Sequence, residues 1–417
     1  MRKFAKKRVL SVIAGMMVLS CILYVRDNTG TGYLPSPLPV RTTGAPRLFT
    51  TDKESTSLFR QFSDMNCLSV QVADPPRRFP ERDLFDGSPL CNTTHPCRPK
   101  AHTKVILLTY MRSGSTFTGD ILSAHPDVFY FFEPLHFLSQ EKHTVFDYLG
   151  LRQKRAGHNH KSYIMRSTMS ALLNCEFEKI DIDTLSQFHL QHSRSTKPYN
   201  DCLTANPGVL GVLRCLHYLY KACCSAQVLL SKTISLGAKM TGELMDSDPR
   251  LRVIHLVRDP RATIWAEGRF HVYKQKDFKT FVVTFCERLL TDLQNIKAIK
   301  QRNPNRAYVV LYENLAKRPL ILTKELYNVM NLPMMKSVFN HVRNKSMEGH
   351  EENCSMCISK ADSARTSQEW RLHLEYDKVK YIDAECQQVY GFLGYKPAES
   401  KAVYTNLSIP LHTWPEI

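Results

Sequence analysis

A single strand–loop–helix unit most constrains the fold of this chain. The apolar run Val105–Leu108 leads into the short polar segment 109–117, and an amphipathic stretch follows. This order predicts a buried strand, a tight loop and the start of a helix. In such a unit, the N–H groups of the loop and of the helix N-terminus converge on a site for an anion, and Arg112 adds a fixed cation. Three hydroxyl groups are also available to phosphate oxygens, those of Ser113, Ser115 and Thr116.

This loop differs from the common ATP-binding loop. The pattern Gly-x4-Gly-Lys-Ser/Thr is absent, so the sequence indicates neither the lysine that reaches the β- and γ-phosphates nor the hydroxyl that holds Mg²⁺. The segment therefore predicts a donor that carries phosphate but is not bound in the manner of ATP.

Apolar runs and amphipathic stretches alternate along the rest of the chain. Strands are predicted at Lys104–Tyr110, Val128–Glu133, Val228–Thr233, Leu251–Val257 and Ala307–Tyr312. Helices are predicted at Thr116–Ala124, Gly237–Met245, Arg261–Phe270, Lys276–Lys300, Lys317–Met330 and Tyr376–Phe392. The alternation indicates an α/β fold, a P-loop-like parallel sheet flanked by helices. The segment 139–225 is basic and irregular, so we expect an insertion with acceptor-binding loops or a variable surface excursion.

The N-terminal region has the pattern of a membrane anchor and a stem. Residues 1–8 are basic, and the stretch 9–25 carries no charge. We therefore expect a transmembrane signal anchor with the N-terminus in the cytosol, while a cleaved secretory signal is the competing interpretation. Residues 26–100 are rich in Pro, Thr, Ser and Arg, which indicates an extended stem. The lumenal domain is expected at 101–398, followed by a C-terminal tail at 399–417.

Composition agrees with a secreted or lumenal globular domain. The 417 residues include 56 Lys and Arg against 39 Asp and Glu, and a net charge of +17 favours polyanionic partners without choosing among them. Of 13 cysteines, all but Cys21 lie outside the predicted anchor, so twelve remain for disulfides. The pairs that are close in sequence are Cys91/Cys97, Cys202/Cys215, Cys223/Cys224 and Cys354/Cys357, although connectivity stays open. Glycosylation tripeptides begin at Asn92, Asn344, Asn353 and Asn406.

Three blocks of sequence resemble one family, the Golgi carbohydrate 6-O-sulfotransferases that act on Gal, GalNAc or GlcNAc. The first block runs from Val105 to Leu135 and contains Arg112-Ser-Gly-Ser-Thr-Phe117 and Val128-Phe-Tyr-Phe-Phe-Glu-Pro-Leu135. The second block is Val253-Ile-His-Leu-Val-Arg-Asp-Pro-Arg-Ala262. The third block combines Trp370-Arg371, Tyr376, Cys386-Gln-Gln-Val389 and Leu393-Gly-Tyr-Lys396.

The resemblance implies PAPS, 3′-phosphoadenylyl sulfate, as the donor and no metal. In that family the first loop binds the 5′-phosphosulfate, so donor contacts are expected at Arg112, Ser113, Gly114, Ser115, Thr116 and Phe117. The second block resembles the strand and helix start that bind the 3′-phosphate, so Arg258 and Arg261 are expected to bind it. Arg112 is also the expected catalytic cation, because sulfuryl transfer places charge on the equatorial and leaving oxygens.

A sugar hydroxyl that accepts the sulfuryl group must lose its proton, and Glu133 is the predicted general base. It ends a predicted strand, at the edge where open α/β sheets bind ligands, and Pro134 prevents regular continuation. A carboxylate here could instead pair with the arginines. His136 is the second candidate for the base, Lys232 resembles a basic position near the donor, and His255 is expected in the core.

The chain departs from the family pattern after the second block. Ala266 stands where the family has a serine, and Glu267 where an arginine usually follows, so one phosphate contact is missing unless Arg261, Thr263 or Arg269 compensates. A catalytically impaired glycan-binding paralogue is therefore one alternative. A metal-dependent Golgi glycosyltransferase is the other, because its Asp-x-Asp pattern occurs at Asp181-Ile-Asp183 and Asp246-Ser-Asp248.

These observations together predict a type II Golgi membrane protein with a lumenal sulfotransferase domain. We expect sulfate transfer from PAPS to the 6-hydroxyl of Gal, GalNAc or GlcNAc in keratan, chondroitin or mucin-type glycans. The expected partners are the glycan acceptor and the membrane, and no nucleic acid. Neither the hexose nor the oligomeric state follows from the sequence.

Overall fold

The computed structural model of the chain describes residues 103–136, 144–145, 154–155, 158–269, 274, 277–347 and 362–413. The predicted anchor at 9–25 and stem at 26–100 lie outside the described residues, as do the pairs Cys91/Cys97 and Cys354/Cys357. Within the described part of the chain, no helix combines the length and the apolar character needed to cross a membrane.

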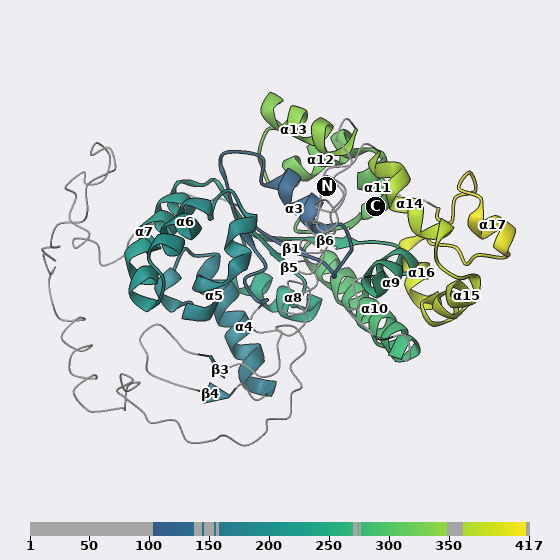
Figure 1. The fold of residues 1–417 in the computed structure, drawn as a ribbon, viewed down its shortest axis with the longest axis horizontal. Helices are drawn as coiled ribbons and strands as arrows, with labels where there is room; N and C mark the ends of the chain where they lie inside the picture. The colour runs from purple at the N-terminus through teal and green to yellow at the C-terminus, as the bar shows by residue number, and fades with distance from the viewer. Residues whose placement is uncertain are drawn as a thin grey trace, which may run out of the picture. The chain divides into compact units, whose positions relative to one another are not determined.

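A parallel sheet of five strands forms the centre of the fold (Figure 1). Its strands run in the order β2-β5-β1-β6-β7, and each neighbouring pair is parallel. The strands are β1 (Thr103–Leu108), β2 (Val128–Phe132), β5 (Val228–Thr233), β6 (Leu251–Val257) and β7 (Ala307–Leu311). All five strands were predicted from sequence, so the expectation of a parallel α/β sheet is confirmed. A separate antiparallel pair is formed by β3 (Thr144–Val145) and β4 (Lys154–Arg155).

Helices follow most strands, as the alternating pattern predicts. In the first half of the domain they are α3 (Ser115–Leu122), α4 (His158–Leu172), α5 (Ile182–Ser186), α6 (Lys197–Ala205), α7 (Val209–Ser225) and α8 (Ala238–Ser247), with 3₁₀ turns η2 (Phe177–Lys179) and η3 (Phe188–His192). In the second half they are α9 (Pro260–Arg269), α10 (Phe278–Arg302), α11 (Tyr312–Lys317), α12 (Pro319–Val329), α13 (Lys336–Ser346), α14 (Ser363–Gln368), η5 (Glu369–Leu372), α15 (Tyr376–Glu385), α16 (Gln387–Leu393) and α17 (Lys401–Thr405).

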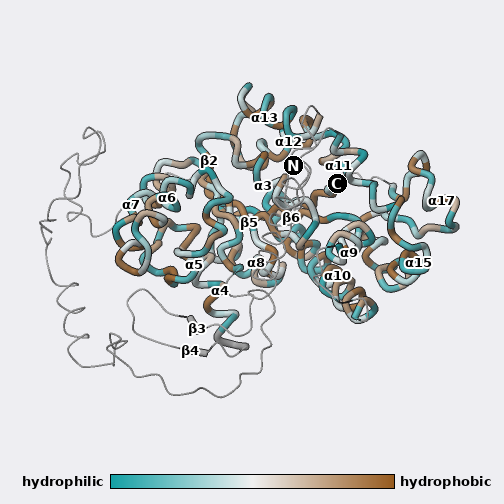
Figure 2. Tube along the Cα trace, viewed as in Figure 1, coloured by the Kyte–Doolittle hydropathy of each residue, from teal (hydrophilic) through white to brown (hydrophobic). Residues whose placement is uncertain are grey.

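Successive residues of the strands face opposite sides of the sheet, and each side has its own core. Ile106 and Leu108 pack into a cluster with residues of α4, α7 and α8, whereas Val105 and Leu107 pack with α3, α12 and α13. Figure 1 shows these two groups of helices on opposite sides of the strands, and Figure 2 shows hydrophobic residues along the central strands. A strand that is buried on both faces reads as a continuous apolar run, which is why β1 was recognisable from sequence.

One predicted helix begins later in the structure and another is divided. The predicted helix 317–330 is α12, which begins at Pro319, because proline has no N–H and is favoured at the first position of a helix. The predicted helix 376–392 breaks at Cys386, which separates α15 from α16 and forms a disulfide with Cys286 of α10.

The prediction of an irregular insertion at 139–225 is wrong for its described part from residue 158 onward. This part is mainly helical, and α7 buries residues at helical spacing, Val212, Cys215, Leu219 and Cys223. Scattered histidines and lysines on the exposed faces obscure that spacing. Of the candidate pairs that are close in sequence, Cys202 and Cys215 form a disulfide, whereas Cys223 bonds to Cys175 and not to Cys224.

The described residues beyond 398 pack on the domain and do not form a separate tail. Arg371 is buried and donates hydrogen bonds to the carbonyl groups of Val403, Tyr404, Asn406 and Ile409. A guanidinium group with several fixed donors suits this task, because it satisfies many carbonyl groups of a turn at once. The domain therefore extends at least to residue 413.

Candidate active site

The segment 109–117, here called the donor loop, turns sharply after β1 and includes the first turn of α3. Gly114 has φ +84° and caps the N-terminus of α3. A Cβ atom at Gly114 would lie 2.2 Å from ring carbons of Tyr312, so both the backbone and the packing require glycine here. The first N–H groups of a helix have no acceptor within it, and those of α3 therefore face the space beyond the carboxyl end of β1.

The side chains of the donor loop divide into internal and outward groups. Ser113 is fully buried; its hydroxyl donates to the carbonyl of Tyr110 at 2.6 Å and lies 2.6 Å from the hydroxyl of Thr109. Phe117 is packed in the core beneath α3. These two predicted donor contacts therefore hold the loop in shape from inside. Thr116 is half-buried at the first turn of α3, where the helix N–H groups begin.

Arginines gather beside the donor loop. Arg258 follows β6, and its Nη1 donates to the carbonyl oxygen of Arg112 at 3.0 Å. Burial lowers the pKa of Arg112, the charges of Arg258 and Arg269 lower it further, and Glu267 opposes them. Like charges held together in a partly buried place destabilise one another until an anion neutralises them. The arrangement therefore suits a ligand with several negative charges.

Arg261 does not fit its predicted contact with the donor. Its side chain is fully buried, with Nη2 2.8 Å from Asp259 and Nη1 3.1 Å from Asp383. The guanidinium group also lies between the rings of Trp370 and Tyr390, 5.1 and 5.0 Å from their centres. We therefore correct this assignment: Arg261 is a core residue that joins α9 to α15, because its charge is already matched by two buried carboxylates.

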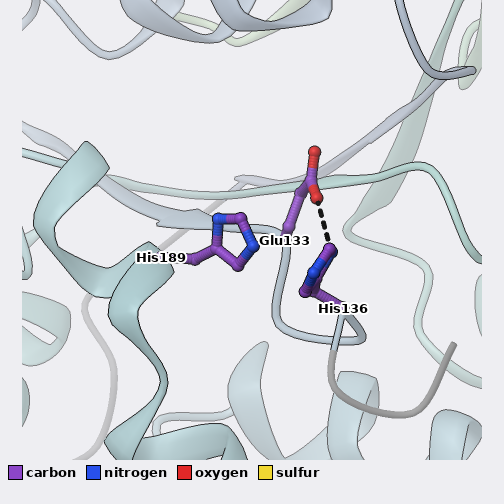
Figure 3. Close-up of side chains that lie close together, drawn as sticks. All are labelled: Glu133, His136 and His189. Carbon is purple, nitrogen blue, oxygen red and sulfur yellow. Dashed lines mark ion pairs between the residues drawn. The ribbon is translucent and has the colours of Figure 1, made fainter. Parts of the chain in front are cut away.

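Glu133 and Lys232 form a buried ion pair at the same edge of the sheet as the donor loop. Strand β2 pairs with β5 so that Phe132 lies opposite Lys232, which brings the Lys232 ammonium group onto the Glu133 carboxylate. The other carboxylate oxygen lies 3.3 Å from Nδ1 of His136 (Figure 3). Burial alone would raise the pKa of Glu133, but the His136 hydrogen bond and the Lys232 charge outweigh it and hold that pKa at about 2.

The two predicted catalytic residues share an unusual backbone conformation. Arg112 has φ +59° and Glu133 has φ +45°, and both residues follow the carboxyl end of a strand. Non-glycine residues in the left-handed region are destabilised by about 1 kcal/mol or more, so the surrounding structure must enforce it. Such strain is common where a side chain has to be aimed at a ligand.

Sequence reasoning did not find the cluster of rings next to Glu133. His189 of η3 is stacked on Phe132, with 5.6 Å between ring centres, and its ring lies 4.1 Å from that of His136. Burial lowers the pKa of His189 to about 4, and the charge of His136 adds to this effect. No sequence signal placed His189 here, because η3 belongs to the segment that was predicted to be irregular.

A pocket of about 410 Å³, here called the edge pocket, opens beside Glu267 and His136. It is bounded by the donor loop, the end of β5, α4 and α10; its lining includes Met111, Lys161, Ser235, Phe281, Phe285 and Arg288. Burial raises the pKa of Glu267 to about 8, although the charges of Arg288 and Arg112 oppose the shift. The neutral carboxyl group therefore leaves the pocket with a cationic character near pH 7.

The remaining residues considered from the sequence, His255 and the two Asp-x-Asp patterns, are held by partners within the fold. His255 is fully buried and its Nε2 lies 3.0 Å from the hydroxyl of Tyr110, as expected for a core histidine. Asp181 caps α5 by accepting a hydrogen bond from the N–H of Thr184. Asp248 pairs with Lys104 at 2.5 Å, before the start of β6 and thus at the opposite edge of the sheet from the donor loop. The two Asp-x-Asp patterns therefore do not form a nucleotide-sugar site here.

These features define a class of protein. A glycine-kinked anion-binding loop, clustered arginines and a buried carboxylate meet at the carboxyl edge of a parallel sheet, which is the usual ligand site of open α/β folds. The class is an enzyme that transfers a charged group from a phosphate-bearing donor. Residues 105–336, more than half of the chain, match the model of the Sulfotransferase family. The chain belongs to the sulfotransferase family, which confirms the class predicted from the sequence.

Similar proteins have names that agree with this assignment. The chain is 26% identical over 345 residues to carbohydrate sulfotransferase 1 of Danio rerio, covering 74% of this chain and 81% of that protein. It is 25% identical over 343 residues to carbohydrate sulfotransferase 3 of Mus musculus, covering 74% and 71%. Among solved structures, the sulfotransferase domain of the Synechococcus PCC 7002 olefin synthase is 18% identical with a TM-score of 0.34, covering 69% and 95%.

Proposed function

We propose that the protein is a PAPS-dependent carbohydrate 6-O-sulfotransferase, held in the Golgi membrane by the predicted anchor at 9–25. The observation that carries the proposal is the meeting of the donor loop and its arginines with the Glu133–Lys232 pair at one sheet edge. The names of the relatives at 24–26% identity support a carbohydrate acceptor. The 6-hydroxyl of Gal, GalNAc or GlcNAc is the finer part of the proposal, and it rests on the sequence resemblance.

The donor is proposed to bind with its 5′-phosphosulfate on the N-terminal turn of α3 and its 3′-phosphate near Arg258. Arg112 would neutralise the phosphate and bridging oxygens as the sulfuryl group leaves. Arg269 is close enough to Arg112 to lower its pKa, so Arg269 is our candidate to supply the phosphate contact that Ala266 does not. These guanidinium groups provide charge that a metal ion provides in many phosphoryl-transfer enzymes, so we propose a metal-independent reaction.

Glu133 is proposed to accept the proton of the acceptor hydroxyl. The hydroxyl oxygen forms a bond to sulfur, the bond from sulfur to the bridging phosphate oxygen breaks, and the proton passes to the carboxylate. A carboxylate with a pKa of about 2 is a weak base, but this value depends on the hydrogen bond with His136 and on the bound Lys232 ammonium group. When a negatively charged sulfuryl group draws Lys232 away, the pKa of Glu133 rises toward the range in which it accepts protons efficiently.

The edge pocket is proposed to hold the acceptor sugar. Its volume of about 410 Å³ lies within the range of small-molecule sites, and it borders both the donor loop and His136. Phe281 and Phe285 offer apolar surface, while Ser235 and Arg288 offer hydrogen-bond donors. A sugar there would present its exocyclic hydroxyl between the Glu133 carboxylate and the donor sulfur.

The decisive experiment is sulfate transfer from labelled PAPS to keratan, chondroitin and mucin-type acceptors by the purified full-length chain. Transfer that persists in EDTA and is abolished in Arg112→Ala and Glu133→Gln would support the proposal and identify the hexose. Arg250→Ala is the matched control, because Arg250 is exposed at the opposite sheet edge and pairs with Asp248. Donor and glycan binding without turnover, restored by Ala266→Ser, would instead identify an impaired paralogue.

A further inference from the structure

Three side chains around the proposed base can act together as ligands of a metal ion. Glu133, His136 and His189 each offer one ligand atom, and these three atoms all lie within 4.8 Å of one another. Figure 3 shows the two imidazole rings next to each other beside Glu133, with the ion pair between Glu133 and His136 drawn. They come from different elements, since Glu133 and His136 follow β2 and His189 belongs to η3.

One of the three distances between the ligand atoms matches that of a tetrahedral zinc site, and all three lie below 4.8 Å. Zinc binds imidazole nitrogen and carboxylate oxygen at about 2.0–2.2 Å, so two ligand atoms on a tetrahedral ion lie about 3.3–3.5 Å apart. Nδ1 of His136 and Oε2 of Glu133 are 3.3 Å apart. Two histidines and one carboxylate with a fourth position left open form a ligand set that zinc commonly adopts in proteins.

His189 provides an independent observation. It is only 7% exposed, and among the residues that the structure describes neither of its ring nitrogens has a hydrogen-bond partner. Burial of a polar atom without a partner is unfavourable, so a ligand that binds these nitrogens would relieve that cost. Stacking on Phe132 holds the ring in place and gives no bond to its nitrogens.

One neighbouring charge limits the affinity of such a site. The Lys232 ammonium group binds the other oxygen of Glu133 and would repel a divalent cation. Zinc would therefore bind most readily when the Lys232 ammonium group has moved away from Glu133. Zinc binding should be reversible, unlike that at a closed structural zinc site with four protein ligands.

We infer that Glu133, His136 and His189 form a binding site for zinc, and that zinc bound there inhibits the enzyme. A metal ion on Glu133 would occupy the carboxylate that accepts the proton of the acceptor hydroxyl. The inhibitory effect rests on the proposed function, whereas the binding of zinc does not. This role is opposite to that of a metal cofactor, because removal of the ion would raise the rate of transfer.

Calorimetric titration of zinc chloride into the metal-stripped full-length chain, without donor or acceptor, tests the binding. His189→Phe keeps the aromatic stacking and removes the ligand nitrogens, and His192→Phe is the control in the same 3₁₀ turn. We expect wild type and His192→Phe to bind one more equivalent of zinc than His189→Phe, or to bind it at least tenfold more tightly. Equal zinc binding by His189→Phe and His192→Phe would overturn the proposal.

The absorption spectrum of bound cobalt gives a second measurement that does not depend on activity. Cobalt in a tetrahedral nitrogen and oxygen site should give visible bands in wild type and His192→Phe that are missing in His189→Phe. Identical bands in all three proteins would overturn the assignment. If the binding result holds but zinc leaves sulfate transfer unchanged, the site stands and the role of Glu133 as the base falls.

Discussion

The buried pair of Glu133 and Lys232 allows a test that separates catalysis from stability. Glu133→Gln keeps the size and an acceptor oxygen of the side chain but removes its charge, and Lys232→Met keeps the length of the lysine. Each single change leaves one charged partner without its counter-ion at a place where both side chains are at least nine-tenths buried. The double variant removes both charges together.

The expected magnitudes differ for the two properties. Breaking a buried ion pair by removing one partner lowers the free energy of unfolding by about 3–5 kcal/mol, whereas replacing both partners by neutral groups is often close to neutral. Loss of a general base lowers kcat by about 10²–10⁴-fold. The double variant should therefore recover most of the stability lost in the single variants and none of the activity lost in Glu133→Gln.

Urea unfolding and sulfate transfer from labelled PAPS, measured on the same preparations, provide the comparison. Both the midpoint of unfolding and the dependence of the unfolding free energy on urea concentration are compared, because a changed dependence reveals a change in the unfolded state. A Glu133→Gln variant with more than half of the wild-type kcat would refute the role of Glu133 as the base. A double variant that is less stable than both single variants would refute the reasoning about the buried pair.

Other parts of the site give further predictions. The pKa of Glu267, raised to about 8 by burial, lies above its ordinary value of 4.5, so the native state keeps a proton that the unfolded chain loses. As the pH rises from about 5 to 8, the wild type should therefore lose stability relative to Glu267→Gln by about 1.4 kcal/mol per pH unit. Urea unfolding at several pH values measures this difference, and parallel pH profiles of the two proteins would contradict it. Gly114→Ala should abolish the thermal stabilisation by PAP, the desulfated form of PAPS, because the added Cβ would collide with Tyr312 and displace the donor loop. Gly208→Ala, at φ +92° with open space around it, should retain that stabilisation. Replacing Cys286 and Cys386 together by Ala should lower the free energy of unfolding by about 2–5 kcal/mol, and an unchanged midpoint would show that this disulfide adds no stability.

Local patterns in the sequence were sufficient for the sheet and the donor loop. The strands 228–233 and 251–257 were predicted to the residue, because strands covered on both faces contain runs of apolar residues. Gly114 could be recognised for a similar reason, since a tight strand-to-helix turn requires a residue that tolerates positive φ. These features depend on neighbours along the chain.

The roles of individual loop and helix residues could not be predicted in the same way. Ser113 and Arg261 carry groups that can bind phosphate, yet both side chains point into the protein. Ser113 donates to a backbone carbonyl group nearby, and Arg261 pairs with a carboxylate that is distant in sequence. Asp383 lies 122 residues from Arg261 and no local pattern connects them. A side chain that can bind an anion can equally be satisfied by a buried carboxylate, and only packing decides between the two.

The sequence by itself determined the class of fold, the anion-binding loop and the family, because these follow from periodicity and short motifs. The tertiary structure alone decided which side chains contact one another beside that loop, and it added His189 to them. The sheet order β2-β5-β1 places Lys232 against Glu133, and η3 brings His189 to the same carboxylate. Strand order and long-range packing depend on how separate apolar faces combine, and this information is not contained in any local stretch of the chain.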